Sequence, residues 1–366
     1  MPRPRTVYRG KRKYSWIITL LAMLLVIAVA LAVWLFYYLQ RYIVYDKDGL
    51  RLDLSAQREE ILRPGAAAEQ TPAPVPAQRV DVEIVVEQRD YSDIQTDAGN
   101  NLQSIHAVYV PAKDVTENTL KYYAGKMGDF DTLVLELKAS DGFLRWHSSV
   151  SQADSFALNG TLELQELLAP LKEQGVRLIA QISALADNAM AQRNAPIALR
   201  SAVTGQPFVG ADGTSYLDPY SDNTRAYLLA LLTELQDMGF DEVLLSGVNC
   251  PDSDALQFSK QMTQTPDSVT AVSSFALWLR ERADALDLTV SAVIDAEALH
   301  SETGGKAGQN PVLFFKAFDR VAVETGFDSF AADIAALQTA LGGQSDTRIV
   351  AIAEDYTPET ASYIVQ

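Results

Sequence analysis

Residues 176–183 read VRLIAQIS, a nearly unbroken apolar run of strand length. The run follows Gly175, which stands where a helical pattern over 162–174 ends. A strand that is apolar on both faces is typical of a parallel sheet covered by helices, and a glycine directly after a helix provides the left-handed cap. This stretch therefore predicts the unit of the fold, a helix that leads into a buried parallel strand.

The same unit recurs over the rest of the chain. Strands are expected at 105–110, 132–138, 176–183, 241–248, 288–294, 320–324 and 348–353, and helices at 117–127, 162–174, 222–238, 268–285 and 327–341. Strict alternation over this length predicts an α/β fold of the (β/α)8 TIM-barrel type in a domain over 80–366, with a doubly wound sheet as the alternative. Seven units are evident and the eighth strand is not, which leaves 80–86 as a candidate to complete the sheet.

The N-terminal region predicts a membrane anchor. No charged residue lies between Lys13 and Arg41, and residues 16–39 read WIITLLAMLLVIAVALAVWLFYYL. These 24 residues reach about 36 Å as a helix, enough to cross a hydrocarbon core of about 30 Å. Six basic residues lie in the tail 1–15, so the positive-inside rule predicts a single-pass membrane protein with a cytoplasmic N-terminus and an extracellular C-terminal domain. The alternative is a signal peptide cleaved near 28–30, but the apolar run continues nine residues further.

A connecting region over 40–79 separates this span from the domain. Residues 42–63 are mixed and charged, and we expect a short juxtamembrane helix there. Residues 63–78 read RPGAAAEQTPAPVPAQ, a composition that cannot bury a core and is typical of an extended spacer.

The charge of the chain is divided sharply. The whole chain carries 30 basic and 47 acidic side chains. Because seven of the basic ones and none of the acidic ones lie within 1–41, the remainder has a net charge of −24. An acidic domain repels a phosphate backbone, so nucleic acid is not expected as a partner. One cysteine and three scattered histidines give no metal-ligand spacing, and we expect neither a metal nor another cofactor.

In a barrel of this type, function collects at the C-terminal ends of the strands. Acids stand at several of these ends, and we predict Glu136 with Glu324 or Glu354 as a catalytic carboxylate pair. Each acid alone has a plain alternative as a helix cap or a loop residue. Acids at a strand start, such as Asp241 and Glu242, belong to the opposite end and are expected to serve stability.

The remaining polar and aromatic residues near strand ends are candidates for substrate binding. They are Tyr109, Lys138, Asp141, Trp146, Asp187, Tyr220 and Asp295. Lys138 lies two residues after Glu136, so both are expected on one strand face, either as a structural ion pair or with Lys138 tuning an acid–base group. Trp146 follows in the next loop, where it either contacts a ligand or packs the loop. The sequence contains no Gly-x-Ser-x-Gly nucleophile elbow and no glycine-rich phosphate loop after a strand.

Four segments carry a family resemblance. They read IHAVYVPAKDV (105–115), LVLELKASDGFLRW (133–146), VRLIAQISALADNAMAQRNAPIALRS (176–201) and SYLDPYSDNTRAYLLALLTELQDMGFDEVLL (215–245). With these segments the stretch 105–355 resembles the bacterial putative glycosyl-hydrolase domain family. The resemblance implies a TIM barrel and a glycosidase-like activity.

One position departs from the pattern of that family. Its fourth strand normally continues as Asp-Tyr-Ile-Arg-Phe-Pro, whereas this chain reads SGVNCP at 246–251, with Ser246 in place of the acid and Asn249 in place of the arginine. A serine cannot supply the charge of a carboxylate or act as a general acid near neutral pH.

Three hypotheses remain open at this point. One is a membrane-anchored glycoside hydrolase that acts on or binds cell-envelope polysaccharide, attached to the lipid bilayer through 16–39. The second is an inactive barrel that serves as a glycan- or protein-binding module of the envelope. The third is a purely structural spacer of the envelope.

Overall fold

The structure is a computed structural model that describes residues 102–260, 267–301, 305–354 and 356–366, together with short pieces at 23–25, 31, 43–46 and 49–52. The chain divides into two compact units, 1–87 and 88–366, and each is described by itself.

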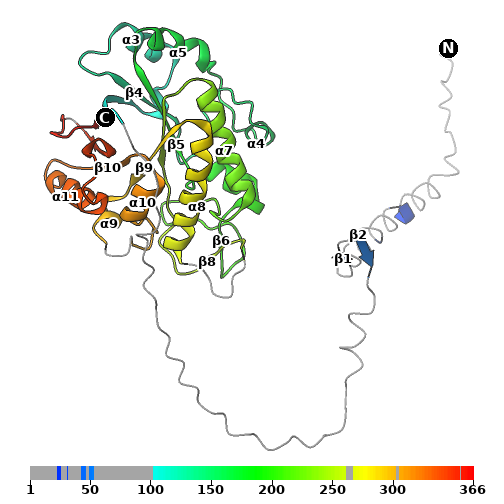
Figure 1. The fold of residues 1–366 in the computed structure, drawn as a ribbon. Coiled ribbons are helices and arrows are strands. Elements are labelled where there is room, and N and C mark those ends of the chain that lie inside the picture. The colour runs from blue at the N-terminus through cyan, green and yellow to red at the C-terminus, as the bar shows by residue number, and fades with distance from the viewer. Residues whose placement is uncertain are drawn as a thin grey trace, which may run out of the picture. The chain divides into compact units, whose positions relative to one another are not determined.

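The second unit is a closed barrel (Figure 1). Within its described residues, eight parallel strands pair in a ring, and β10 closes it by pairing with β9. In order around the ring they are β3 His106–Val110, β4 Thr132–Lys138, β5 Arg177–Ser183, β7 Glu242–Ser246, β9 Thr289–Ile294, β10 Val321–Glu324, β11 Ile349–Ala353 and β12 Tyr363–Val365. The predicted (β/α) barrel is confirmed, and the doubly wound alternative is wrong because the sheet has no open edge.

The eighth strand is β12, which the sequence did not reveal. It has three residues and lies between β11 and β3, where Ile364 pairs with Ile352 and Ala107. A run this short carries no periodicity, and its place is fixed only by its two neighbours. The candidate segment 80–86 lies outside the described residues.

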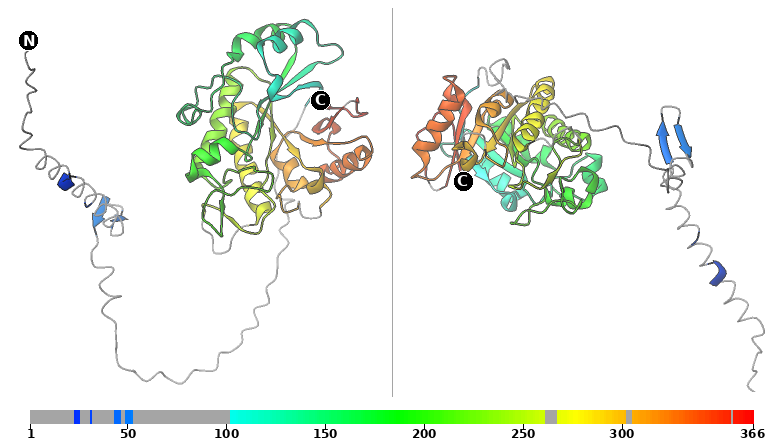
Figure 2. Two further views of the ribbon diagram at one scale, coloured as in Figure 1. Left: turned by 180° about the vertical axis from the view of Figure 1, so that it is seen from behind. Right: turned by 90° about the horizontal axis from the view of Figure 1, so that it is seen from below.

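Helices cover the outside of the barrel in all three views (Figures 1 and 2). The longer ones are α3 Glu117–Gly125, α5 Leu164–Glu173, α7 Asp222–Asp237, α8 Ser268–Ala283, α10 Pro311–Ala317 and α11 Phe330–Leu341. Each of the predicted helices is present, and α10 is an addition. Gly175 and Gly239 follow α5 and α7 with φ values of 78° and 83°, so the expected left-handed caps are formed.

Long loops follow β5 and β7 on the C-terminal side of the barrel. The loop after β5 includes the short helix α6 Asn188–Arg193. Two other short helices are α4 Ser151–Ser155, which follows β4, and α9 Ala296–Leu299, which follows β9. The loops after β5 and β7 are joined by an antiparallel ribbon of β6 Arg200–Ser201 and β8 Leu256–Gln257.

In the first unit, β1 Ile43–Asp46 pairs antiparallel with β2 Gly49–Leu52. The short juxtamembrane helix expected here is therefore wrong. The run Ile43-Val44-Tyr45 favours a strand, and the Asp-Gly pair at 48–49 favours a tight hairpin.

The predicted membrane span, 16–39, lies outside the described residues apart from helical pieces at 23–25 and 31, and so does the spacer 63–78. Within the part of the chain that is described, no helix combines the length and apolar character needed to cross a membrane.

The core has two layers. The outer layer fills the space between strands and helices. The inner layer lies inside the barrel and takes at least one small or branched side chain from each strand: Ala107, Val134, Ile179, Leu244, Val293, Ala322, Ile352 and Ile364, with Val350 and Ile105 in the same layer. Because side chains alternate along a strand, the residues two positions further on also point inward.

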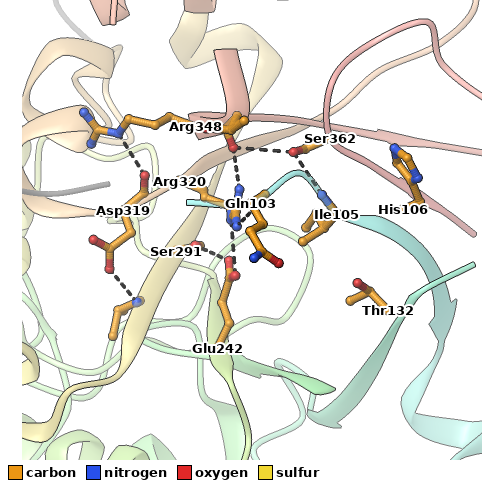
Figure 3. Close-up of polar contacts among 12 residues, drawn as sticks. Gln103, Ile105, His106, Thr132, Glu242, Ser291, Asp319, Arg320, Arg348 and Ser362 are labelled. Atoms are coloured by element: carbon orange, nitrogen blue, oxygen red, sulfur yellow. Dashed lines mark hydrogen bonds and ion pairs between the residues drawn. The ribbon is translucent and has the colours of Figure 1, made fainter. Parts of the chain in front are cut away.

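The N-terminal end of the barrel is closed by a buried polar network, which we call the floor (Figure 3). The Nε of Arg320 donates to Oε2 of Glu242 over 3.2 Å, and both side chains are almost fully buried. Ser291 also donates to Glu242. The guanidinium further donates to the carbonyl of Gln103 over 2.7 Å and to that of Thr347. Glu242 thus serves stability, as its position at a strand start predicts.

Candidate functional site at the barrel mouth

The C-terminal end of the barrel, which we call the mouth, carries a ring of polar side chains. Each member stands two residues after an inner-layer residue of its strand, so strand alternation directs it toward the barrel axis. The ring consists of Tyr109, Glu136, Gln181, Ser246, Asp295, Glu324, Glu354 and Gln366. Four of the predicted site acids are therefore brought to one end of the barrel from four strands.

Glu136 is held by two donors. Its Oε2 accepts a hydrogen bond from the backbone N–H of Ala112 over 2.8 Å. Its carboxylate also interacts with the hydroxyl of Tyr109, which lies beside Gln181. Burial, followed by the charge and hydrogen bond of Glu136, raises the pKa of Tyr109 well above its usual value. Tyr109 therefore remains a neutral donor, and together with the N–H of Ala112 it orients the carboxyl group of Glu136.

Glu324 has a different environment. Burial in the mouth raises its pKa, and the negative charges of Asp295, Glu354 and Glu136 raise it further. Water still reaches the carboxylate, but the surrounding protein removes part of its hydration, and three like charges disfavour ionisation. Burial, followed by the charge of Glu297, also raises the pKa of Asp295. Glu324 differs from Asp295 in that three neighbouring acids, Asp295, Glu354 and Glu136, raise its pKa and so favour its protonated form.

The acids of the mouth form no ion pair with a cationic side chain of the described residues. None of the ion pairs formed by the described residues includes Glu136, Asp295, Glu324 or Glu354. Perturbed acids that cluster without counter-charges are more often functional than structural.

Glu324 and Glu354 line one cleft of about 420 Å³. Its other lining residues are Thr325, Gly326, Phe327, Ile352, Tyr356 and Gln366. Phe327 is 81% exposed, and its ring meets that of Tyr356 edge to face at 5.7 Å. Phe327 and Tyr356 were not among the binding residues expected from the sequence, where the aromatic candidates were Tyr109, Trp146 and Tyr220. The available signal was an aromatic residue in the loop directly after each of two strand-end acids.

Lys138 does not pair with Glu136. The register between β4 and β5 slips between these two residues: Glu136 pairs with Gln181, but Lys138 pairs with Ile182. The slip turns Lys138 out of the barrel, where its Nζ lies 2.8 Å from Oδ2 of Asp187 and also donates to the carbonyl of Ser183. The expectation that Glu136 and Lys138 share one face is therefore wrong, because strict alternation fails at a β-bulge.

Two predicted substrate-binding residues are thus removed from solvent. Lys138 and Asp187 are both fully buried, and Asp187 also caps α6 by accepting from the N–H of Met190 over 2.8 Å. They hold the loop after β5 in place and offer no surface to a substrate.

Trp146 is also buried, with no exposed surface. Its indole Nε1 donates to Oε2 of Glu234 on α7 over 3.0 Å. Of the two readings left open for this ring, the structure supports loop packing and corrects the assignment to substrate binding.

Two further candidates lie in the loops around the mouth. Asp141 is partly exposed and pairs with Arg145 over 2.7 Å. Tyr220 lines a separate cleft of about 450 Å³ with Arg225 and Lys260, and Glu324 and Glu354 do not line that cleft.

The acids of the mouth do not converge as a metal site. Among the residues that the structure describes, no three histidine, cysteine, aspartate or glutamate side chains are grouped so that they could hold an ion. The arrangement suits proton transfer, for which separate carboxyl groups are needed.

Comparison with known proteins agrees with this geometry. The model of a family described as "Putative glycosyl hydrolase domain" matches residues 107–323, more than half of the chain. A search of curated protein sequences gave no match.

Similar solved structures include a hypothetical protein from Ruminiclostridium thermocellum ATCC 27405, 18% identical, with 50% of this chain and 96% of that chain covered and a TM-score of 0.45. An exo-β-N-acetylglucosaminidase from Vibrio harveyi, in complex with N-acetylglucosamine, is 10% identical, with 69% and 41% covered and a TM-score of 0.48. A chitinase from Chromobacterium violaceum ATCC 12472 is 12% identical, with 68% of each chain covered and a TM-score of 0.40. The chain spans less than half of the Vibrio harveyi enzyme.

Proposed function

We propose, from the premise that this chain belongs to the putative glycosyl hydrolase domain family, that its barrel cleaves glycosidic bonds at the mouth. The observation that carries the proposal is the unequal environment of two carboxyl groups. Glu324 has a pKa raised by burial and like charges, whereas Glu136 receives two hydrogen-bond donors. Glycoside hydrolysis requires one protonated and one ionised carboxyl group flanking the bond.

The roles follow from these environments. Glu324 acts as the general acid and gives its proton to the oxygen of the leaving sugar. Glu136, oriented by Ala112 and Tyr109, acts on the anomeric carbon, either directly as a nucleophile or by activating a water molecule. Glu354 borders the same cleft as Glu324 and helps to keep the proton on it through like-charge repulsion.

The location and substrate of the enzyme are also part of the proposal. The apolar run at 16–39 and the spacer at 63–78 support a barrel tethered outside the membrane. A tether of this kind keeps the barrel close to the cell surface. We therefore place its substrate among the polysaccharides of the cell envelope.

A second function is favoured by one observation. Ser246 occupies the ring position at the end of β7 where the family pattern has an acid. If that acid is essential to turnover, the mouth binds a glycan without cleaving it, and the protein is a recognition module of the envelope.

One experiment separates the two functions. The full chain, purified in detergent micelles, is offered envelope polysaccharides, and both binding and release of reducing ends are measured. Hydrolysis that is lost in Glu136→Gln and in Glu324→Gln, but kept in the matched surface control Glu281→Gln, supports catalysis at the mouth. Binding with no release of reducing ends supports the recognition module. Hydrolysis that is unchanged in both mouth variants would overturn the assignment of the site.

A further inference from the structure

The cleft beside Glu324 has an aromatic border that the catalytic roles do not use. Tyr356 is fixed by its hydroxyl, which donates to the carbonyl of Thr325 over 3.3 Å. Phe330 meets its ring edge-on at 6.4 Å, and Phe327 meets it at 5.7 Å on the side of the cleft. Phe327 itself remains 81% exposed although it is a large apolar side chain. Exposed rings that border a polar cleft offer an apolar surface on which the face of a sugar ring can lie.

The same cleft is acidic. Glu324 and Glu354 line it, and Asp295 and Glu136 lie close enough for their charges to act on Glu324. No lysine or arginine is among its lining residues, and no ion pair of the described chain neutralises these four acids. A ligand with an anionic group would therefore be repelled, and a ligand with a positive charge would be attracted.

A metal ion does not account for this charge. Metal binding requires several carboxylates that converge on one point, and no such group is present among the described residues. The acids are distributed around the mouth instead. Distributed negative charge beside an aromatic surface suits an organic cation that is larger than an ion and has an apolar face.

We propose that the cleft binds a sugar unit that carries a free amino group, as in a de-N-acetylated amino sugar. The face of the sugar ring lies on Phe327 and Tyr356, and its ammonium group faces Glu354, because Glu324 carries the proton in the proposed reaction. The inference rests on the proposed function, because it names the substrate class of the same mouth. An N-acetylated or neutral sugar would make the stacking contact but would leave the carboxylates without a counter-charge.

The test measures binding by calorimetry, with the full chain in detergent micelles. The probes are a β-1,4-linked glucosamine trimer and the matched N-acetylglucosamine trimer, at about pH 6, where an amine with the pKa of an α-amino group, about 7.7–8.0, is protonated. We expect the free-amine trimer to bind about tenfold more tightly at low salt, and the difference to shrink as ionic strength rises because salt screens exposed charges.

Two variants locate the contact. Phe327→Ala should weaken binding of both trimers about fivefold because it removes the stacking surface. Glu354→Gln should weaken only the free-amine trimer, by about threefold, because it removes one exposed carboxylate. The matched controls are Tyr122→Ala, an exposed ring elsewhere on the domain, and Glu281→Gln, an exposed acid elsewhere.

Each result has a defined meaning. Equal affinity for the two trimers, or tighter binding of the acetylated one, overturns the proposal. Controls that weaken binding as much as the cleft variants also overturn it, because they show general attraction to an acidic surface. Amine-selective binding in the cleft without any hydrolysis leaves this proposal standing and removes the catalytic one. Hydrolysis without a preference for the free-amine trimer supports the catalytic proposal and overturns the proposal of amine recognition.

Discussion

The two ends of the barrel place charges in opposite ways. At the floor, Glu242 is buried but receives hydrogen bonds from Arg320 and Ser291, and Arg320 in turn reaches two backbone carbonyls. At the mouth, Glu136, Asp295, Glu324 and Glu354 stand together with no cationic partner in the described part of the chain. A buried charge that is fully paired is compatible with the fold, and removing only its partner is strongly destabilising. Acids that are crowded and unpaired reduce stability, and such groups persist where they serve a reaction or a ligand.

The largest expected effect is at the mouth. Glu324→Gln keeps the shape of the side chain but removes the proton donor, so we expect kcat for glycan hydrolysis to fall about 100- to 10,000-fold. Removing a crowded acid should not weaken the fold, and the midpoint of urea denaturation should stay the same or rise. Glu281→Gln is the control. A Glu324→Gln variant that turns over at the rate of the unaltered chain would contradict the assignment.

The sign of that stability effect follows from linkage. The pKa of Glu324 is raised above its ordinary value, so the folded chain holds this proton more tightly than the unfolded chain. The contribution of Glu324 to stability is therefore full below its unfolded pKa and is lost as pH rises through its folded pKa. The variant Glu324→Gln should therefore be more stable than the unaltered chain at pH values above the folded pKa of Glu324. The difference in stability should vanish below the unfolded pKa, and urea denaturation at several pH values can measure it.

The next largest effect is at the floor. Arg320→Ala leaves Glu242 buried without its partner, and we expect a loss of about 3–5 kcal/mol in the free energy of unfolding. Arg282→Ala, at a partly exposed arginine, should cost far less. The double variant Glu242→Leu with Arg320→Met should recover much of the loss. If Arg320→Ala costs no more than the surface control, the floor does not stabilise the barrel.

A smaller effect is expected at Trp146, whose buried indole N–H donates to Glu234. Trp146→Phe removes the hydrogen bond to Glu234, which keeps its bonds to Ser148 and Ser149. We expect a loss of about 1 kcal/mol in the free energy of unfolding and no change in KM. A clear rise in KM without loss of stability would restore this ring to the substrate-binding surface.

The smallest effect is a shift in pH dependence. The charge of Glu354 is one cause of the raised pKa of Glu324. Glu354→Gln should therefore lower that pKa, and the alkaline limb of the kcat profile, where the general acid loses its proton, should move to lower pH. An alkaline limb that stays in place would show that Glu324 is not the group that titrates there.

Much of the barrel could be predicted from local patterns. Seven strands can be recognised as apolar runs because each is buried on both faces. Glycines such as Gly175 and Gly239 mark the helix ends because a left-handed cap favours glycine. The bounds of the predicted strands place Glu136, Glu324 and Glu354 at or near the strand ends. The structure brings these three side chains to the mouth of the barrel. Their catalytic role remains a prediction.

Other features could not be predicted because they depend on contacts between distant residues. The strand β12 is too short to have a pattern, and its partners β11 and β3 fix its place. Lys138 looked like the partner of Glu136 by spacing, but a slip in register against β5 turned it toward Asp187. The border of Phe327 and Tyr356 joins loops that follow two different strands.

The sequence by itself thus determined seven of the barrel strands, the order of the main elements and the end at which acids gather, because burial and helix capping are read from neighbouring residues, whereas closure of the barrel through β12 is seen only in the structure. Only the tertiary structure decided which charges are paired. Arg320 and Glu242 meet across the floor although 78 positions separate them, whereas the acids of the mouth form no ion pair within the described residues and raise the pKa of Glu324 by their charges. Pairing depends on strand register and ring closure, which arise when all eight strands are in place.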